Sequence, residues 1–295
     1  VSGGDVSFGT GVNISTPTGG TITIFSGNAN TSTLMTHMSG PGGTTTTKYK
    51  TYNVSYNDIG AGAQGGTYNF YYRQKPTLTI SGLTATKTYD GTDNAVGYLS
   101  GGAVSGQIDG DTALGMGNLT LTSATFGSAN VLGTNGSSLT ANYSESNQVI
   151  DYWNISGYRV NTFNSATAGT INKAALGVSV SGTYNGTTGY TNGTSGTTAT
   201  FTGLQNSETL DNAALTLNDK NVTSNGTNYV TAVTAGTGDT AAMGNYQITL
   251  SRNATAGQTT TNVVSLSKAA LGVSLTGTYN GTTGYTNGTS GTTAT

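Results

Sequence analysis

With 295 residues, the chain is long enough for two or three modules of ordinary domain size, yet only 7% of its residues are charged and its net charge is −2. Soluble domains usually carry about 25% charged residues, so serine, threonine and asparagine must hydrate this surface. The pI of about 5.1 and the lack of a basic patch argue against nucleic-acid binding, and the absence of cysteine excludes thiolate catalysis and zinc–thiolate sites.

The first 40 residues contain short apolar pairs separated by turns rich in glycine, asparagine and serine. These pairs are Val6/Phe8, Val12/Ile14 and Ile22/Ile24. Brief strands that alternate with turns are typical of a parallel β-helix, in which each strand stacks on the next. We therefore expect residues 1–40 to form the C-terminal coils of a β-helical shaft.

Residues 41–74 depart from that pattern. They begin with Pro-Gly-Gly and a threonine run, and their last part is strongly aromatic. Because side chains alternate across a strand, Tyr68, Phe70 and Tyr72 should share one face. We interpret this stretch as a cap or adaptor that precedes the repeats.

An internal repeat is the strongest feature of the sequence. Residues 173–200 recur 95 positions later as residues 268–295, and the two copies differ at two positions. A more divergent copy begins at Lys75, and its Tyr89 lies another 95 residues before Tyr184. A fixed period predicts a tandem array. We expect this chain to be one part of a longer repeat array.

The array divides into modules at 75–172 and 173–267, with the start of a third at 268–295. Apolar residues alternate within each module, as in Leu176, Val178 and Val180, so the expected fold is all-β. Asn-Gly pairs between the apolar runs predict hairpins with type I′ turns. We expect β-sandwich or β-grasp-like modules of about 95 residues, with a helix only at 207–214.

Ordered motifs give the chain a family resemblance. They are KTYDGT at 87–92, TYNGT at 183–187 and 278–282, GDT at 110–112, DKNV at 219–222 and GNYQITL at 244–250. In this order they resemble the YDG-type repeats of large bacterial exoproteins of the filamentous haemagglutinin class. The later copies depart from the motif, since they carry asparagine where the family has aspartate.

The resemblance implies export by two-partner secretion, with an outer-membrane partner, and display at the bacterial cell surface. The expected function is a structural stalk that extends the binding region of a secreted adhesin toward glycans or proteins of the host or of neighbouring cells. The alternative is a self-assembling extracellular fibre or biofilm matrix protein, because sheet edges with few charges pair easily. We expect no transmembrane segment, no cofactor and no enzymatic activity.

Candidate sites are few. His37 is the single histidine and cannot form a conventional zinc site without cysteines. The segment Asp109-Gly110-Asp111 resembles part of a calcium loop but lacks its frame, so we interpret it as a polar turn. Glu145 and Glu208 fall in different modules, so they do not form an acid pair for glycoside hydrolysis.

Aromatic residues could contact glycans by stacking, and the candidates are Tyr89, Tyr184, Tyr279 and Trp153. We favour the alternative that these rings pack within the modules, with the tyrosine hydroxyls hydrogen-bonded. Sequons are abundant, and the candidates for glycosylation are Asn118, Asn142, Asn154, Asn185, Asn192 and Asn221. An isopeptide cross-link, which needs a lysine, an asparagine and a buried carboxylate, is a further hypothesis for the boundary residues Lys75, Lys173 and Lys268.

Overall fold

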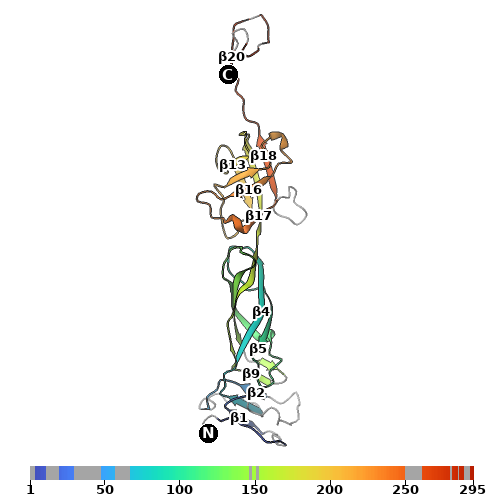
Figure 1. Ribbon diagram of the computed structural model, residues 1–295, viewed down its shortest axis with the longest axis vertical. Helices are drawn as coiled ribbons and strands as arrows, with labels where there is room; N and C mark the ends of the chain where they lie inside the picture. The colour runs from blue at the N-terminus through green and yellow to red at the C-terminus, as the bar shows by residue number, and fades with distance from the viewer. Residues whose placement is uncertain are drawn as a thin grey trace. The chain divides into compact units, whose positions relative to one another are not determined.

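The computed structural model describes residues 4–10, 20–29, 48–56, 67–145, 148–150, 153–249, 261–279, 281–284, 286–288 and 293–295. It divides into two compact units, Val1–Lys173 and Ala174–Thr295. The fold is all-β, as predicted (Figure 1). The helical turns among the described residues are the 3-10 segments η3 (Met116–Asn118), η4 (Val222–Ser224) and η5 (Met243–Asn245).

The helix expected at 207–214 is therefore wrong. Asn206 and Ser207 have φ angles of 49° and 59°, which lie in the left-handed region and begin a turn. The following residues form a further turn before the next strand begins at Ala214.

In the first unit, one sheet gathers the aromatic residues. It contains β1 (Ile22–Ser26), β2 (Lys48–Thr51), β3 (Tyr68–Tyr72), β8 (Gln148–Ile150) and β9 (Trp153–Ser156) in the order β1-β3-β2-β9-β8. Strands β1, β3, β2 and β9 run parallel to one another, and β8 is antiparallel to β9. Strand β3 lies between β1 and β2, whereas successive coils of a β-helix pair in chain order. Because β9 pairs with β2, this sheet also crosses the module boundary expected at residues 74 and 75.

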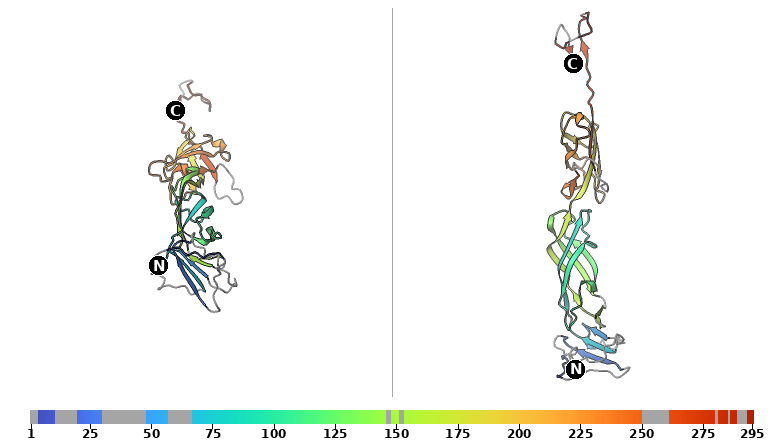
Figure 2. Two further views of the ribbon diagram at one scale, coloured as in Figure 1. Left: turned by 60° about the horizontal axis from the view of Figure 1, so that its bottom comes forward. Right: turned by 90° about the vertical axis from the view of Figure 1, so that its right-hand side faces the viewer.

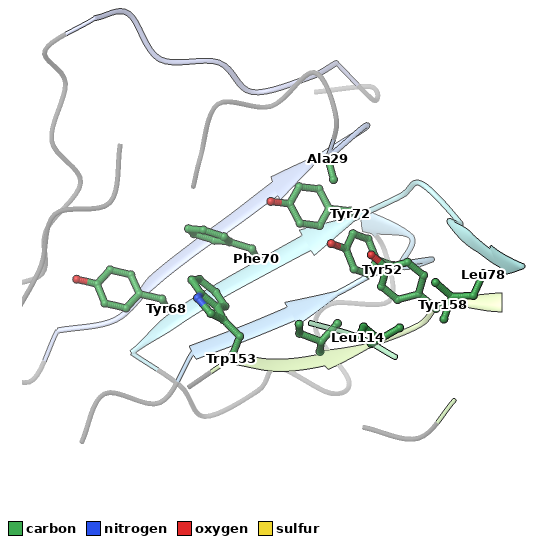
Figure 3. Close-up of a cluster of buried hydrophobic side chains, with 10 residues drawn as sticks. Ala29, Tyr52, Tyr68, Phe70, Tyr72, Leu78, Leu114, Trp153 and Tyr158 are labelled. Carbon is green, nitrogen blue, oxygen red and sulfur yellow. The ribbon is translucent and has the colours of Figure 1, made fainter. Parts of the chain in front are cut away.

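Alternate aromatic residues of β3 share one face of the strand, as predicted from their spacing. Tyr68, Phe70 and Tyr72 lie in one buried cluster with Trp153. Phe70 packs against Trp153, with ring centroids 5.4 Å apart (Figure 3). This cluster forms the hydrophobic core of the first sheet.

The second sheet of the first unit is built around β4. It contains β4 (Thr77–Thr88), β5 (Leu99–Ser105), β6 (Leu119–Phe126), β7 (Gly133–Glu145), β10 (Arg159–Val160) and β11 (Phe163–Asn172). Strand β4 pairs in an antiparallel manner with β5, while β10 and β11 run parallel to it. Figure 2 shows β4, in cyan, beside the yellow-green β11. The first and last strands of this sheet are thus parallel neighbours.

The second unit has two main sheets. Strands β12 (Ala174–Thr183), β14 (Thr198–Thr202), β17 (Tyr246–Ile248) and β18 (Asn262–Ser267) form one, and β13 (Gly189–Thr191), β15 (Ala214–Leu217) and β16 (Val230–Thr234) form the other. A short pair, β19 (Leu275–Thr276) and β20 (Thr293–Ala294), follows. Leu176, Val178 and Val180 are buried along β12, in agreement with their alternation.

Strand pairing recurs at the spacing of the sequence repeat. The parallel pairs Ala85↔Gly169 and Thr88↔Asn172 join β4 to β11, and the same pairs 95 residues later, Val180↔Val264 and Thr183↔Ser267, join β12 to β18. The antiparallel pair Val180↔Ala199 likewise returns as Leu275↔Ala294. One residue, Lys173, separates β11 from β12.

The prediction of type I′ turns at Asn-Gly pairs is wrong. Such a turn needs φ above zero at both residues, and no pair within the described ranges has this. The asparagine side chains instead replace backbone partners. Asn225 accepts from the Leu266 N–H at 2.8 Å and donates to the Leu266 carbonyl at 2.7 Å.

Candidate functional site

A buried charge cluster connects the two sheets of the first unit. Lys50, on β2, is 1% exposed, and Asp111, in the turn after β5, is 2% exposed. The Lys50 Nζ atom lies 2.5 Å from Asp111 Oδ1 and 3.4 Å from Asp109 Oδ2. It also donates to the Asp109 carbonyl at 2.7 Å. Lysine and aspartate are rarely buried this deeply unless they are paired, so this contact holds β2 against the turn.

Three tyrosine hydroxyls complete the cluster. Tyr52 and Tyr158 both donate to Asp111 Oδ2, at 2.7 and 2.9 Å, and Tyr72 donates to Asp109 Oδ2 at 3.0 Å. The three rings lie together, and Tyr52 stacks on Tyr72 with centroids 5.2 Å apart (Figure 3). We call Lys50, Tyr52, Tyr72, Asp109, Asp111 and Tyr158 the Lys50 cluster.

The electrostatics of the Lys50 cluster follow from burial. Burial, reinforced by the charge of Asp111, raises the pKa of Tyr52 and of Tyr158, so both hydroxyls keep their protons and act as donors. Burial also raises the pKa of Asp109, although Lys50 opposes that change.

The backbone of the turn sets these positions. Asp109 and Gly110 have φ angles of 52° and 80°, which reverse the chain and bring both aspartates toward Lys50. The polar-turn interpretation of this segment therefore agrees with the structure. Its buried lysine partner was missed because Lys50 is distant in sequence and contained in no repeat.

The second unit contains a related turn. The Tyr158 hydroxyl accepts from the Ile108 N–H at 3.0 Å, and the Tyr246 hydroxyl accepts in the same way from the Gln205 N–H at 2.9 Å. Tyr246 then donates to Glu208. A tyrosine hydroxyl thus binds both a backbone N–H and a carboxylate of an acidic turn in each unit.

A second buried lysine explains the KTYDGT motif. Lys87 Nζ donates to Asp90 Oδ1 and to the Thr92 carbonyl, both at 2.7 Å. Asp90 Oδ1 also accepts from the Thr92 N–H at 2.9 Å. In the second unit glycine and asparagine replace this lysine and aspartate at 182 and 185. Both members of the ion pair are therefore replaced in the second unit. Without the lysine no charged acceptor is needed, which accounts for asparagine in the later copies.

Replacement of Asp90 by asparagine is expected to destabilise the first unit by about 1–3 kcal/mol, because the buried Lys87 loses its charged acceptor. Although burial opposes it, bonds from Lys87 and Thr92 hold the pKa of Asp90 below its ordinary value. The stabilisation should thus be present above the unfolded-state pKa and vanish as pH falls through the lower folded-state pKa. Urea unfolding at neutral and acidic pH measures both effects.

The matched control is Asn185→Asp in the second unit, where no lysine occupies position 182. It should change stability by less than about 1 kcal/mol. Equal effects of the two substitutions would contradict the role given to Lys87.

No family model matches the chain, and neither does any curated protein or solved structure. Within the described residues, no helix is long and apolar enough to span a bilayer. The same part of the chain holds no group of three or more His, Cys, Asp or Glu side chains placed to bind a metal. His37 lies outside the described residues.

The candidate glycan-contact residues differ in exposure. Tyr89 and Trp153 are 4% and 7% exposed, so neither ring offers a face for a stacked sugar, and both pack inside the fold as the favoured interpretation expected. Tyr279 is 86% exposed. Tyr184 is half-buried and lines an open pocket with Asn221 and Lys268.

The six candidate glycosylation sites differ in access. Asn185 and Asn221 are exposed, whereas Asn118, Asn142, Asn154 and Asn192 are half-buried. Every one of these amides donates a hydrogen bond, for example Asn192 Nδ2 to the Leu210 carbonyl at 3.1 Å. Attachment of a sugar is therefore easiest at the exposed Asn185 and Asn221.

Of the two glutamates considered as acid–base residues for hydrolysis, Glu145 belongs to the first unit and Glu208 to the second. Burial raises the pKa of Glu145 to about 6, and its carboxylate accepts from the Gly157 N–H at 3.1 Å. This bond gives Glu145 a role in holding β7 near β9.

Proposed function

We propose that the chain is a structural stalk of a secreted bacterial surface adhesin, and that its units carry tension between a binding region and the cell. One observation carries this proposal. In both units the first and last strands of a sheet run parallel and in register, at Ala85↔Gly169 through Thr88↔Asn172 and at Val180↔Val264 through Thr183↔Ser267.

Parallel terminal strands are suited to tension. A force that enters at the start of β12 and leaves at the end of β18 pulls on opposite ends of the pair. The hydrogen bonds of the parallel ladder are evenly spaced, so they share the load and must break together. A single residue between β11 and β12 leaves little slack in the chain.

The finer assignments belong to the same proposal. Residues 75–172 and 173–267 are tandem β-sandwich or β-grasp-like modules. The N-terminal sheet is the end of a β-helical shaft in which the strands do not pair in chain order. The YDG-type motifs support export through an outer-membrane partner to the cell surface. Glycans or proteins on host or neighbouring cells are the proposed targets of the whole protein.

The alternative, a self-assembling fibre or biofilm matrix, has one observation in its favour. The chain has few charged residues, and sheet edges with few charges pair easily with a strand of another copy.

Sedimentation and small-angle scattering over a range of concentrations separate the two functions. The stalk predicts a monomer at every concentration. Growth of the particles with concentration would favour the fibre and contradict the stalk as the main role.

A further inference from the structure

We propose that Lys50 and Asp111 are joined by an intramolecular amide bond, which makes the contact between β2 and the turn after β5 covalent. Both residues lie in the first unit. The stalk function does not depend on this bond, so each proposal can fail without the other.

Proximity is the first argument. Lys50 Nζ lies 2.5 Å from Asp111 Oδ1, which places the amine beside the carboxyl carbon. Both side chains are almost fully buried, so they are held in this geometry and shielded from bulk water. Groups held in contact react as if at very high concentration.

The second argument is the environment of the carboxyl group. Oδ2 of Asp111 accepts two hydrogen bonds, from Tyr52 and Tyr158. Attack of the amine on Cγ places negative charge on this oxygen, and fixed donors at such a position stabilise a tetrahedral intermediate. Both tyrosines keep their protons, since burial raises their pKa.

Asp109 supplies the proton transfer. Its Oδ2 lies 3.4 Å from Lys50 Nζ, close enough to take a proton after a small movement. Burial raises the pKa of Asp109, so this carboxyl can accept a proton from the ammonium group and return it to the departing oxygen.

The step balances without a co-reactant. The C–N bond forms between Cγ of Asp111 and Nζ of Lys50, and the bond between Cγ and Oδ1 breaks. Two protons of the ammonium group leave with Oδ1 as one water molecule, and nothing is oxidised or reduced. A neutral amide replaces an ion pair whose burial is costly, which favours the product within the fold.

The other lysines lack this setting. Lys87 also contacts a carboxylate, but the Asp90 side chain is 35% exposed. The boundary residues Lys75, Lys173 and Lys268 are exposed, which removes the burial that the cross-link hypothesis for them requires. We therefore expect one cross-link per chain.

The test is the mass of the whole denatured chain together with a peptide map. The expected mass is lower than the sequence mass by one water molecule, and trypsin should not cleave after Lys50. One peptide should join the segments that contain Lys50 and Asp111. Lys50→Arg should restore the full mass, Lys87→Arg should leave the deficit unchanged, and Asp109→Asn should lower the cross-linked fraction.

A full sequence mass with separate peptides overturns the proposal. A succinimide at Asp109-Gly110 also removes one water, but it would persist in Lys50→Arg and be cleaved by hydroxylamine. That result overturns the proposal as well. The wild-type map decides the question even if a variant fails to fold.

Discussion

Replacement of Lys50 by methionine is expected to destabilise the first unit by about 3–5 kcal/mol, the usual effect of leaving a buried carboxylate without its partner. The substitution leaves the carboxyl groups of Asp109 and Asp111 buried without a cation. It also loosens the attachment of β2 to the turn after β5. Urea-induced unfolding, followed by the fluorescence of Trp153, reports this change in the same unit.

Lys75→Met is the matched control, because Lys75 belongs to the same unit and is exposed. Its effect should stay within about 0.5 kcal/mol. A Lys50→Met protein as stable as the control would show that the Lys50 cluster does not hold the two sheets together.

Ser265→Pro is expected to destabilise the second unit by about 3 kcal/mol or more, since proline removes a backbone donor and its ring clashes with the ladder. Val178 donates to the Thr261 carbonyl, and Tyr184 donates to the Ser267 carbonyl. In a parallel ladder this register makes residue 265 a donor from β18 to β12. The Ser265 side chain is exposed, so the substitution tests the backbone bond and not packing.

Ser265→Thr keeps the N–H group and should be nearly neutral, within about 0.5 kcal/mol. Thermal unfolding followed by circular dichroism compares the two variants. Similar unfolding midpoints would mean that the parallel pairing of β12 and β18 contributes little to the unit.

Local patterns predicted the buried faces of several strands. The alternation of Leu176, Val178 and Val180 anticipated the buried face of β12, and the aromatic alternation of β3 anticipated its core cluster. The 95-residue shift also carried over to strand register. The two predicted buried faces share a cause, because period-two burial is a property of each strand by itself.

Long-range pairing was not predictable from one sequence. Strand β9 joins β2 across about 100 residues, and no local signal marks that choice. The Asn-Gly turns failed for a related reason: the side chain of Asn225 binds β18, which is distant in sequence. The Lys50 cluster was missed because its members come from segments that are far apart in the sequence. The GDT motif contains Asp111, but nothing in the motif indicates that a lysine binds there.

The most direct test of the stalk is the force needed to unfold the second unit in two pulling geometries. The chain has no cysteine, so introduced pairs give unique attachment points. Handles at Ala175→Cys and Ser267→Cys load opposite ends of β12 and β18, whereas handles at Ala175→Cys and Val263→Cys load the same end and peel the ladder. The account predicts a clearly higher rupture force for the first pair. Equal forces, or a lower force for the first pair, would contradict it.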